Sequence, residues 1–219
     1  MLVRVILITG ITGILLLGAW YFWFLHYNRR KAGKILHWIG RTFQGHGHVA
    51  DMQWVTASRF HVRMELFPTM FRRASVIVQL FPREIPFLWL LRRSRREQET
   101  LTFQADLDAP PSFNLEVHNH RWYGRTRRRL PLSPLGWTLE QSGPFILTTR
   151  NEWQREITTM MNSLLASREC DCTMVCFRRS SPHFAATVPL ETISPQSQTH
   201  TEIFDVLREL AAGASTARF

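Results

Sequence analysis

The stretch GAWYFWFLHYNRRKAGK, residues 18–34, places aromatic side chains directly before a run of cations. It closes a segment, residues 5–25, in which no side chain carries a formal charge. A helix of that length spans about 31 Å, close to the bilayer's hydrocarbon thickness of about 30 Å. A helix also satisfies its own backbone hydrogen bonds in lipid. The sequence therefore predicts a transmembrane anchor within residues 1–27.

The residues that follow the apolar run predict the orientation of the anchor. Aromatic rings favour the headgroup zone and cations favour the cytoplasmic side. Both kinds of candidate anchor contact cluster at the C-terminal end of the run: Trp20, Tyr21, Trp23, Tyr27, Arg29, Arg30, Lys31 and Lys34. Arg4 is the only charged side chain before the run. We expect a single-pass signal-anchor protein with its N-terminus outside and its C-terminal part in the cytoplasm.

A cleaved signal peptide is the competing interpretation, and it would place the rest of the chain outside the cell. The thin n-region, the long apolar run and the lack of an A-x-A-like site favour an uncleaved anchor. Three cysteines in 219 residues argue against a disulfide scaffold. Thr9 and Gly13 have the spacing of a small-xxx-small pair, which leaves open a homodimer or a membrane-protein partner.

Composition limits the remaining chain to an ordinary globular protein. A hydrophobic fraction of 45% is ordinary for a globular domain and argues against a disordered chain, and the residues beyond the anchor suffice for one buried core. The net charge of +10 favours anionic partners, either lipid headgroups or nucleic acid. Neither a P-loop nor a G-x-G-x-x-G motif occurs, so nucleotide chemistry lacks its usual phosphate cradle.

Residues 28–45 predict a basic juxtamembrane helix or linker. Apolar side chains recur at helical spacing among the cations: Ile35, Leu36, Trp38, Ile39 and Phe43. Such a helix can lie along the headgroups or dock on the following domain, and the sequence leaves both placements open. The glycines of QGHGH, residues 44–48, are expected to end it.

Residues 46–219 predict a cytoplasmic α+β domain with a mostly antiparallel sheet. Strand-like runs follow one another: MQWV, FHVRMELF, ASVIVQLF, TLTFQADL, FNLEVHNHRW, two short runs around residues 142–143, CTMVCF and HFAATVPL. A turn is expected within residues 69–75. Alternation predicts two core-facing sets, Leu101, Phe103, Ala105 and Leu107 in one strand and Phe113, Leu115 and Val117 in another.

Two late amphipathic helices complete the predicted domain. Thr149-x-x-Glu152 and Thr199-x-x-Glu202 have the form of capping boxes, and an apolar stripe follows each. We therefore expect helices over residues 149–165 and 199–211. Consecutive strands with helices late in the chain are typical of the α+β class.

Histidine pairs are the candidate metal ligands. His46 and His48, and His118 and His120, form two H-x-H pairs, each of which can place two imidazoles on one side of a strand. A site requires the two pairs to meet in space, and a membrane-tethered metalloenzyme is the corresponding alternative function. We assign no catalytic residue, no resident metal and no cofactor, and we favour a protein that is not an enzyme.

Three further clusters are expected to be structural. Cys170, Cys172 and Cys176 would share one face of an extended strand, but a straight strand spreads thiolates too far apart for zinc. The segment RSSPHF, residues 179–184, holds serines and a histidine without a nucleophile elbow. Asp106-x-Asp108 is expected to end a strand rather than bind a cation.

Two arginine clusters are the main functional signal of the soluble part, and both are expected on loops. The first follows an apolar run at residues 87–91 and contains Arg92, Arg93, Arg95 and Arg96. The second lies beside Trp122 and Tyr123 and contains Arg125, Arg127, Arg128 and Arg129. An apolar tip flanked by arginines suits an anionic lipid surface. Arginines beside aromatics also suit single-stranded nucleic acid, and a core strand ending in solvated arginines is the remaining interpretation.

Taken together, these patterns predict a membrane-anchored, basic, non-catalytic interaction or scaffold module. The lipid bilayer is its first partner, with anionic headgroups as candidate contacts. Nucleic acid is disfavoured, because the anchor already holds the domain at a membrane. The metalloenzyme and a membrane-associated nucleic-acid binder remain the alternatives.

Overall fold

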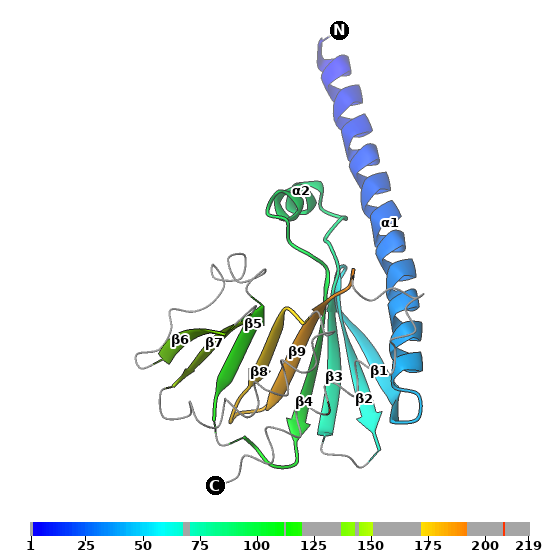
Figure 1. Ribbon diagram of the computed structural model, residues 1–219. Helices are drawn as coiled ribbons and strands as arrows, with labels where there is room; N and C mark the ends of the chain where they lie inside the picture. Colours follow the sequence, from blue (N-terminus) through cyan, green and yellow to red (C-terminus); the bar gives the residue numbers. More distant parts are fainter. Residues whose placement is uncertain are drawn as a thin grey trace.

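The structure, a computed structural model, describes residues 2–67, 71–111, 113–119, 137–142, 145–150, 172–191 and 208. A long helix, α1 (Leu2–Thr42), leads into an antiparallel sheet, and a short helix, α2 (Pro86–Ser94), lies between two strands (Figure 1). The strands are β1 (Gly47–Thr56), β2 (Arg59–Leu66), β3 (Phe71–Gln79), β4 (Thr100–Leu107), β5 (Leu115–Asn119), β6 (Trp137–Ser142), β7 (Phe145–Arg150), β8 (Met174–Phe177) and β9 (Phe184–Pro189). The architecture confirms the predicted α+β class with an antiparallel sheet.

Helix α1 has two halves in different surroundings. Its N-terminal half projects beyond the sheet, exposes its apolar side chains and has the length and composition to cross a membrane (Figure 1). Its C-terminal half belongs to the hydrophobic core through Ala32, Trp38 and Ile39, and Phe43 continues this contact directly after the helix. Of the two placements considered for the juxtamembrane helix, the structure therefore shows docking on the domain.

The glycines after α1 allow the chain to turn into the sheet. Gly45 has a φ of +92°, a left-handed conformation that costs glycine little. Gly47 begins β1, and a Cβ there would lie 2.3 Å from the backbone oxygen of Glu65 on β2. The predicted end of the helix at QGHGH is confirmed, and the close approach of β2 explains the second glycine.

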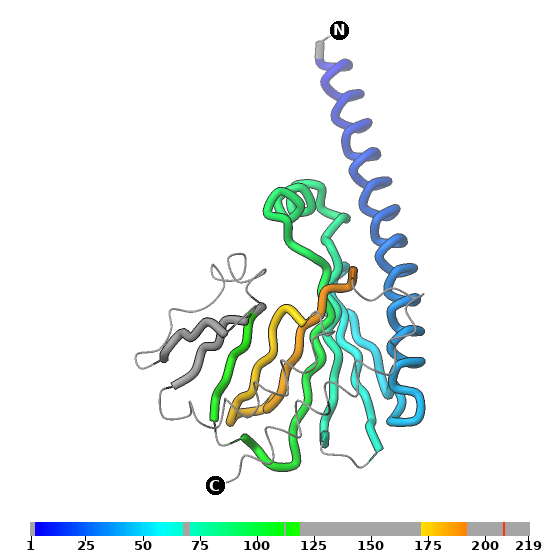
Figure 2. The backbone as a smooth tube through the Cα atoms, in the orientation of Figure 1, coloured from blue at the N-terminus to red at the C-terminus, as the bar shows by residue number. Residues whose placement is uncertain are grey.

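Strands far apart in sequence become neighbours in the sheet. The described strands have the order β1-β2-β3-β4-β9-β8-β5-β7-β6. Strands β1 to β4 form a meander, and the late hairpin β8–β9 then inserts between β4 and β5. Figure 2 shows β4 running beside β9. The double proline after β4 therefore separates two strands that are not paired with each other.

One face of the sheet carries the core. Both predicted core-facing sets are buried, and rings from four segments meet there. Phe103 on β4 lies 5.8 Å from Phe43, 5.5 Å from Phe71 and 6.2 Å from Phe184, measured between ring centroids. The opposite face is more polar, with Thr102 and Thr187 hydrogen-bonded across β4 and β9 at 3.0 Å. Because successive side chains of a strand point to opposite faces, apolar residues gather on the core face and polar residues on the other.

The start of β3 differs from the sequence prediction, and the predicted late helices fall largely on residues that are not described. Residues 71–75 form the start of β3 rather than a turn, because they pair with β4 from Phe71 onward. The helices predicted over residues 149–165 and 199–211 lie largely outside the described residues. Within those ranges, Thr149 and Arg150 belong to β7 and Arg208 is helical.

Replacing Phe103 with alanine should lower the free energy of unfolding by about 3 to 5 kcal/mol. The side chain is 1% exposed and touches Phe43, just after α1, and rings from β3 and β9, so its loss leaves a cavity that cannot easily collapse. Urea unfolding of the full chain in detergent micelles measures the effect. Phe67→Ala, at a site 57% exposed, is the matched control and should change stability by less than about 0.5 kcal/mol. Equal effects of the two changes would contradict this core.

Candidate membrane-surface site

Helix α2 forms from the apolar segment that precedes the first arginine cluster. Pro86 occupies its first turn, where the missing N–H is not needed. The helix ends near Arg96, which has a φ of +50° and donates its backbone N–H to the oxygen of Arg93 at 2.9 Å. The core-strand interpretation of residues 87–91 was therefore wrong. Of the arginines expected on a loop, Arg92 and Arg93 lie on the helix, whereas Arg95 and Arg96 follow its end. The strand interpretation failed because this apolar run is not buried.

The apolar side chains of α2 face away from the core. Phe87 is 73% exposed and Leu90 is 61% exposed, and no residue of the helix is buried. At about 100° per residue, Phe87, Leu90 and Leu91 share one sector of the helix. Trp89 falls on the opposite side, between Arg92 and Arg93. Helix α2 is thus amphipathic with its apolar face unpartnered by the described part of the chain.

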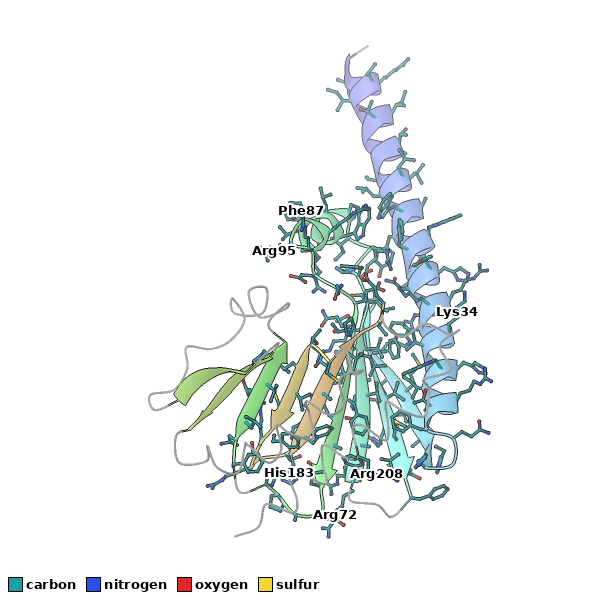
Figure 3. The ribbon with its side chains drawn as sticks, in the orientation of Figure 1. Lys34, Arg72, Phe87, Arg95, His183 and Arg208 are labelled. Atoms are coloured by element: carbon teal, nitrogen blue, oxygen red, sulfur yellow. The ribbon has the colours of Figure 1, made fainter. Side chains whose placement is uncertain are left out.

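The arginines of α2 gather behind this apolar face. The guanidinium of Arg93 lies 5.5 Å from the ring centroid of Trp89, and Arg92 pairs with Glu97 at 3.7 Å. In Figure 3, Phe87 lies on the side of α2 nearer the N-terminus of α1, whereas Arg95 lies lower, toward the sheet. The second cluster, Arg125, Arg127, Arg128 and Arg129, lies outside the described residues.

Trp20 joins the exposed half of α1 to the α2 segment. Its indole Nε1 donates a hydrogen bond to the backbone oxygen of Arg83 at 2.9 Å. Its ring also lies 6.4 Å from that of Trp89 on α2. Buried indole N–H groups usually find such an acceptor. The contact sets α2 beside the end of the predicted membrane span.

A polar cluster, which we call the hinge clamp, fixes α1 to the two connections that flank α2. Its members are Asn28 and Lys31 on α1 with Arg83, Glu84 and Glu99. Glu99 pairs with both Lys31 and Arg83, the latter at 2.9 Å, and accepts the Phe81 backbone N–H at 3.1 Å. Asn28 is fully buried and donates to a carboxylate oxygen of Glu84 at 3.1 Å. A buried carboxylate with two cations and a backbone donor is compensated for its lost hydration.

Of the other predicted anchor residues, some contact the sheet domain and others are exposed to solvent. The Arg29 guanidinium lies 3.7 Å over the Trp54 ring on β1, and that of Arg83 lies 5.0 Å from the Tyr27 ring. Tyr21, Trp23, Arg30 and Lys34 are exposed. In the apolar half, Thr9 and Thr12 donate to backbone oxygens of α1 itself. The span therefore satisfies these hydroxyls without an external partner.

The structure places His118 far from His46 and His48. His46 and His48 lie at the β1 edge, and His48 is 3.3 Å from Glu65. His118 lies on β5, six strand positions away, which is about 29 Å along the sheet. His120 is outside the described residues. Among the residues that are described, no group of three or more His, Cys, Asp or Glu side chains is placed to hold a metal.

Ser181, His183 and Asp106 do meet, but not as a catalytic triad. Ser181 Oγ donates to Asp106 Oδ1 at 2.6 Å. His183 Nδ1 accepts the Leu107 backbone N–H at 3.2 Å, so this nitrogen has no proton to give to the carboxylate. A triad needs the serine on the histidine and a proton between histidine and acid. The three side chains instead tie the β8–β9 turn to the end of β4, and Asp108 pairs with Arg72.

The two described cysteines lie on different sides of the sheet. Cys172 belongs to the core cluster, whereas Cys176 is opposite Glu116 and lies on the other face from Val175 and Phe177. The expectation that the cysteines share a face is therefore wrong for this pair, because Cys172 precedes β8 and does not follow its alternation. Cys170 is outside the described residues. Burial, with the nearby Glu116 carboxylate, raises the pKa of the Cys176 thiol to about 12.

Comparison with known proteins gives no family and no relative from which a function could be inferred. No family model matches the chain, and a search of curated proteins found no match. Sequence reasoning named the arginines at and after α2 and the residues at the end of the apolar run, and their roles stay predictions. It missed the hinge clamp, because Asn28, Glu84 and Glu99 carry no local pattern that predicts burial.

Replacing Glu99 with glutamine should lower the free energy of unfolding by about 3 kcal/mol, because Lys31 and Arg83 lose their shared counter-charge at a buried site. Chemical unfolding of the full chain in detergent measures this. Asp108→Asn is the matched control, since its pair with Arg72 is exposed, and it should cost less than about 1 kcal/mol. Equal stability of the two variants would remove the hinge clamp as a stabilising element.

Cys176 should resist alkylation by iodoacetamide at pH 8 in the folded chain and react after unfolding. The raised pKa keeps the group a thiol, and the thiolate is the nucleophile. Peptide mass spectrometry with and without urea separates the two states. Modification of native Cys176 at the rate of an unfolded cysteine would contradict the buried environment.

Proposed function

We propose that this chain is a single-pass membrane protein whose sheet domain is an interaction module held at the cytoplasmic face of a bilayer. The observation that carries the proposal is the continuity of α1, which exposes an apolar half and contributes its other half to the domain core. A flexible tether would let the domain rotate freely. A helix that is also a core element fixes one pose of the domain relative to the membrane.

Charge supports the proposed orientation, with the N-terminus outside. Arg29, Arg30 and Lys34 follow the apolar half closely, and Arg4 alone precedes it. Contacts of the domain core with residues 28–43 also give the helix a role that survives insertion, which favours a retained anchor over a cleaved signal peptide. The partner of the module is a lipid bilayer together with a protein, either another membrane protein or a second copy.

Anionic headgroups are the proposed ligand of the arginines on α2. Arg92, Arg93, Arg95 and Arg96 concentrate basic charge beside the apolar half of α1, where Trp89 meets Trp20. Lys34 lies farther from the N-terminus of α1 than Arg95 does (Figure 3). The second arginine cluster, residues 125–129, remains a prediction for the same role. The separation of His46 and His48 from His118 gives the metalloenzyme alternative no support, and no contact of the described residues favours nucleic acid over lipid.

Cysteine accessibility in intact cells tests the proposed topology. Val3→Cys should react with a membrane-impermeant maleimide added outside, and Val55→Cys should react only after permeabilisation. Both positions are well exposed in the folded chain, at 75% and 61%, so burial cannot explain protection. The unsubstituted chain reports labelling of the native cysteines.

Membrane extraction and intact mass complete this test. The full-length chain should remain in the membrane pellet after alkaline carbonate treatment. Labelling of Val55→Cys in intact cells, or a mature chain that lacks residues 1–27, would overturn the proposed function.

A further inference from the structure

The depth of α2 follows from its contact with α1. The predicted span ends at Leu25, and Trp20 lies five residues before it, about 7.5 Å inside that boundary at the rise of an α-helix. Trp89 is in ring contact with Trp20, so α2 lies near the same level. Interfacial helices bury their apolar faces about 5 to 10 Å into the headgroup and acyl boundary. The level of α2 therefore matches that of a helix lying in the membrane surface.

The two faces of α2 have the matching polarity. Its exposed apolar sector, with Phe87 and Leu90, is directed away from the domain, and Phe87 lies on the side nearer the N-terminus of α1 (Figure 3). Arg95 lies on the opposite, sheet-ward side. Residues 86–97 hold four arginines and one glutamate, a net charge of +3. Cations at headgroup level below an apolar face are complementary to an acidic leaflet.

Resting on the proposed function, we propose that α2 is a second membrane contact, inserted into the acidic leaflet from which α1 emerges. Acyl chains cover Phe87 and Leu90, and phosphate or carboxylate headgroups meet the arginines. A bilayer is the occupant because α1 brings it to this face in every copy. A protein partner would have to displace that lipid and also neutralise the cations.

The two contacts together define the pose of the domain. A single helix through a membrane leaves rotation about its own axis and tilt unrestricted. A second helix at the surface, joined rigidly through the hinge clamp, removes both freedoms. The same edge of the sheet then always faces the bilayer, and the end of β2 near Phe67 faces away from it (Figure 1).

Depth-dependent fluorescence quenching of the full chain in nanodiscs tests the insertion. Single cysteines at Ile14, Leu90 and Phe67 carry an environment-sensitive dye, and lipids with a quencher near the headgroup or at the chain end report depth. The dye at Leu90 should be quenched by the shallow quencher and the dye at Ile14 by the deep one. The dye at Phe67, an equally exposed apolar site at the distal end of the sheet, should stay in water.

Lipid composition tests the charge. In phosphatidylcholine mixed with phosphatidylserine, the inserted fraction at Leu90 should exceed that in phosphatidylcholine alone. The double variant Arg93→Gln with Arg95→Gln should reduce this excess. Each lost arginine should lower the insertion equilibrium constant in the acidic lipid by about fivefold. The dye at Ile14 should not respond to either change. Equal insertion in both lipids would overturn the acidic-lipid part.

The remaining outcomes separate this inference from the proposed function. A solvated dye at Leu90 with a buried dye at Ile14 would overturn the surface helix and leave the anchor standing. Solvated dyes at both sites would overturn both. If the dye at Leu90 reports an apolar environment but is not quenched by either lipid quencher, a protein surface covers α2, and the lipid assignment is overturned.

Discussion

The structure depends on one constraint: a single helix exposes an apolar half and packs its other half into the core of the sheet domain. The first half of α1 offers apolar side chains outward on all sides, as a membrane requires, and the second half buries only one stripe against the sheet. The change occurs at Asn28, the first fully buried polar residue of the helix. Because the helix does not break there, its exposed apolar half is held in a fixed direction relative to the sheet.

The hinge clamp makes that link specific. Packing of Ile39 and Phe43 would tolerate sliding or rotation of α1, since apolar contacts have little directionality. Paired charges and a buried amide do not, because each displaced partner would leave an unsatisfied group in a poorly hydrated place. Glu99 is bound by α1 through Lys31 and by the β3–α2 connection through Arg83, so the same carboxylate orients α2 as well.

The described residues that resembled catalytic or metal sites have structural roles or lie too far apart to form a site. Ser181 and His183 tie a turn to β4, and His118 lies six strand positions from β1, at whose start His46 and His48 lie. Within the described part of the chain, the apolar face of α2 is a surface feature without a structural role. Phe87 and Leu90 are large apolar side chains exposed to solvent, and transfer of their surface from water into a membrane would be favourable.

The sequence alone determined the long apolar helix, most of the strand-forming runs and the inward faces of β4 and β5, because these depend on local length, charge and alternation. The core-facing residues of β4 and β5 follow from period two without any knowledge of the neighbours. Tertiary structure alone decided the insertion of β8–β9 between β4 and β5, the docking of α1 and the burial of Glu99. It also decided that residues 87–91 form an exposed helix, since a short apolar run has the same composition in a core strand and on a membrane surface. Pairing across long sequence separations is set by packing between distant segments, and no local pattern records it.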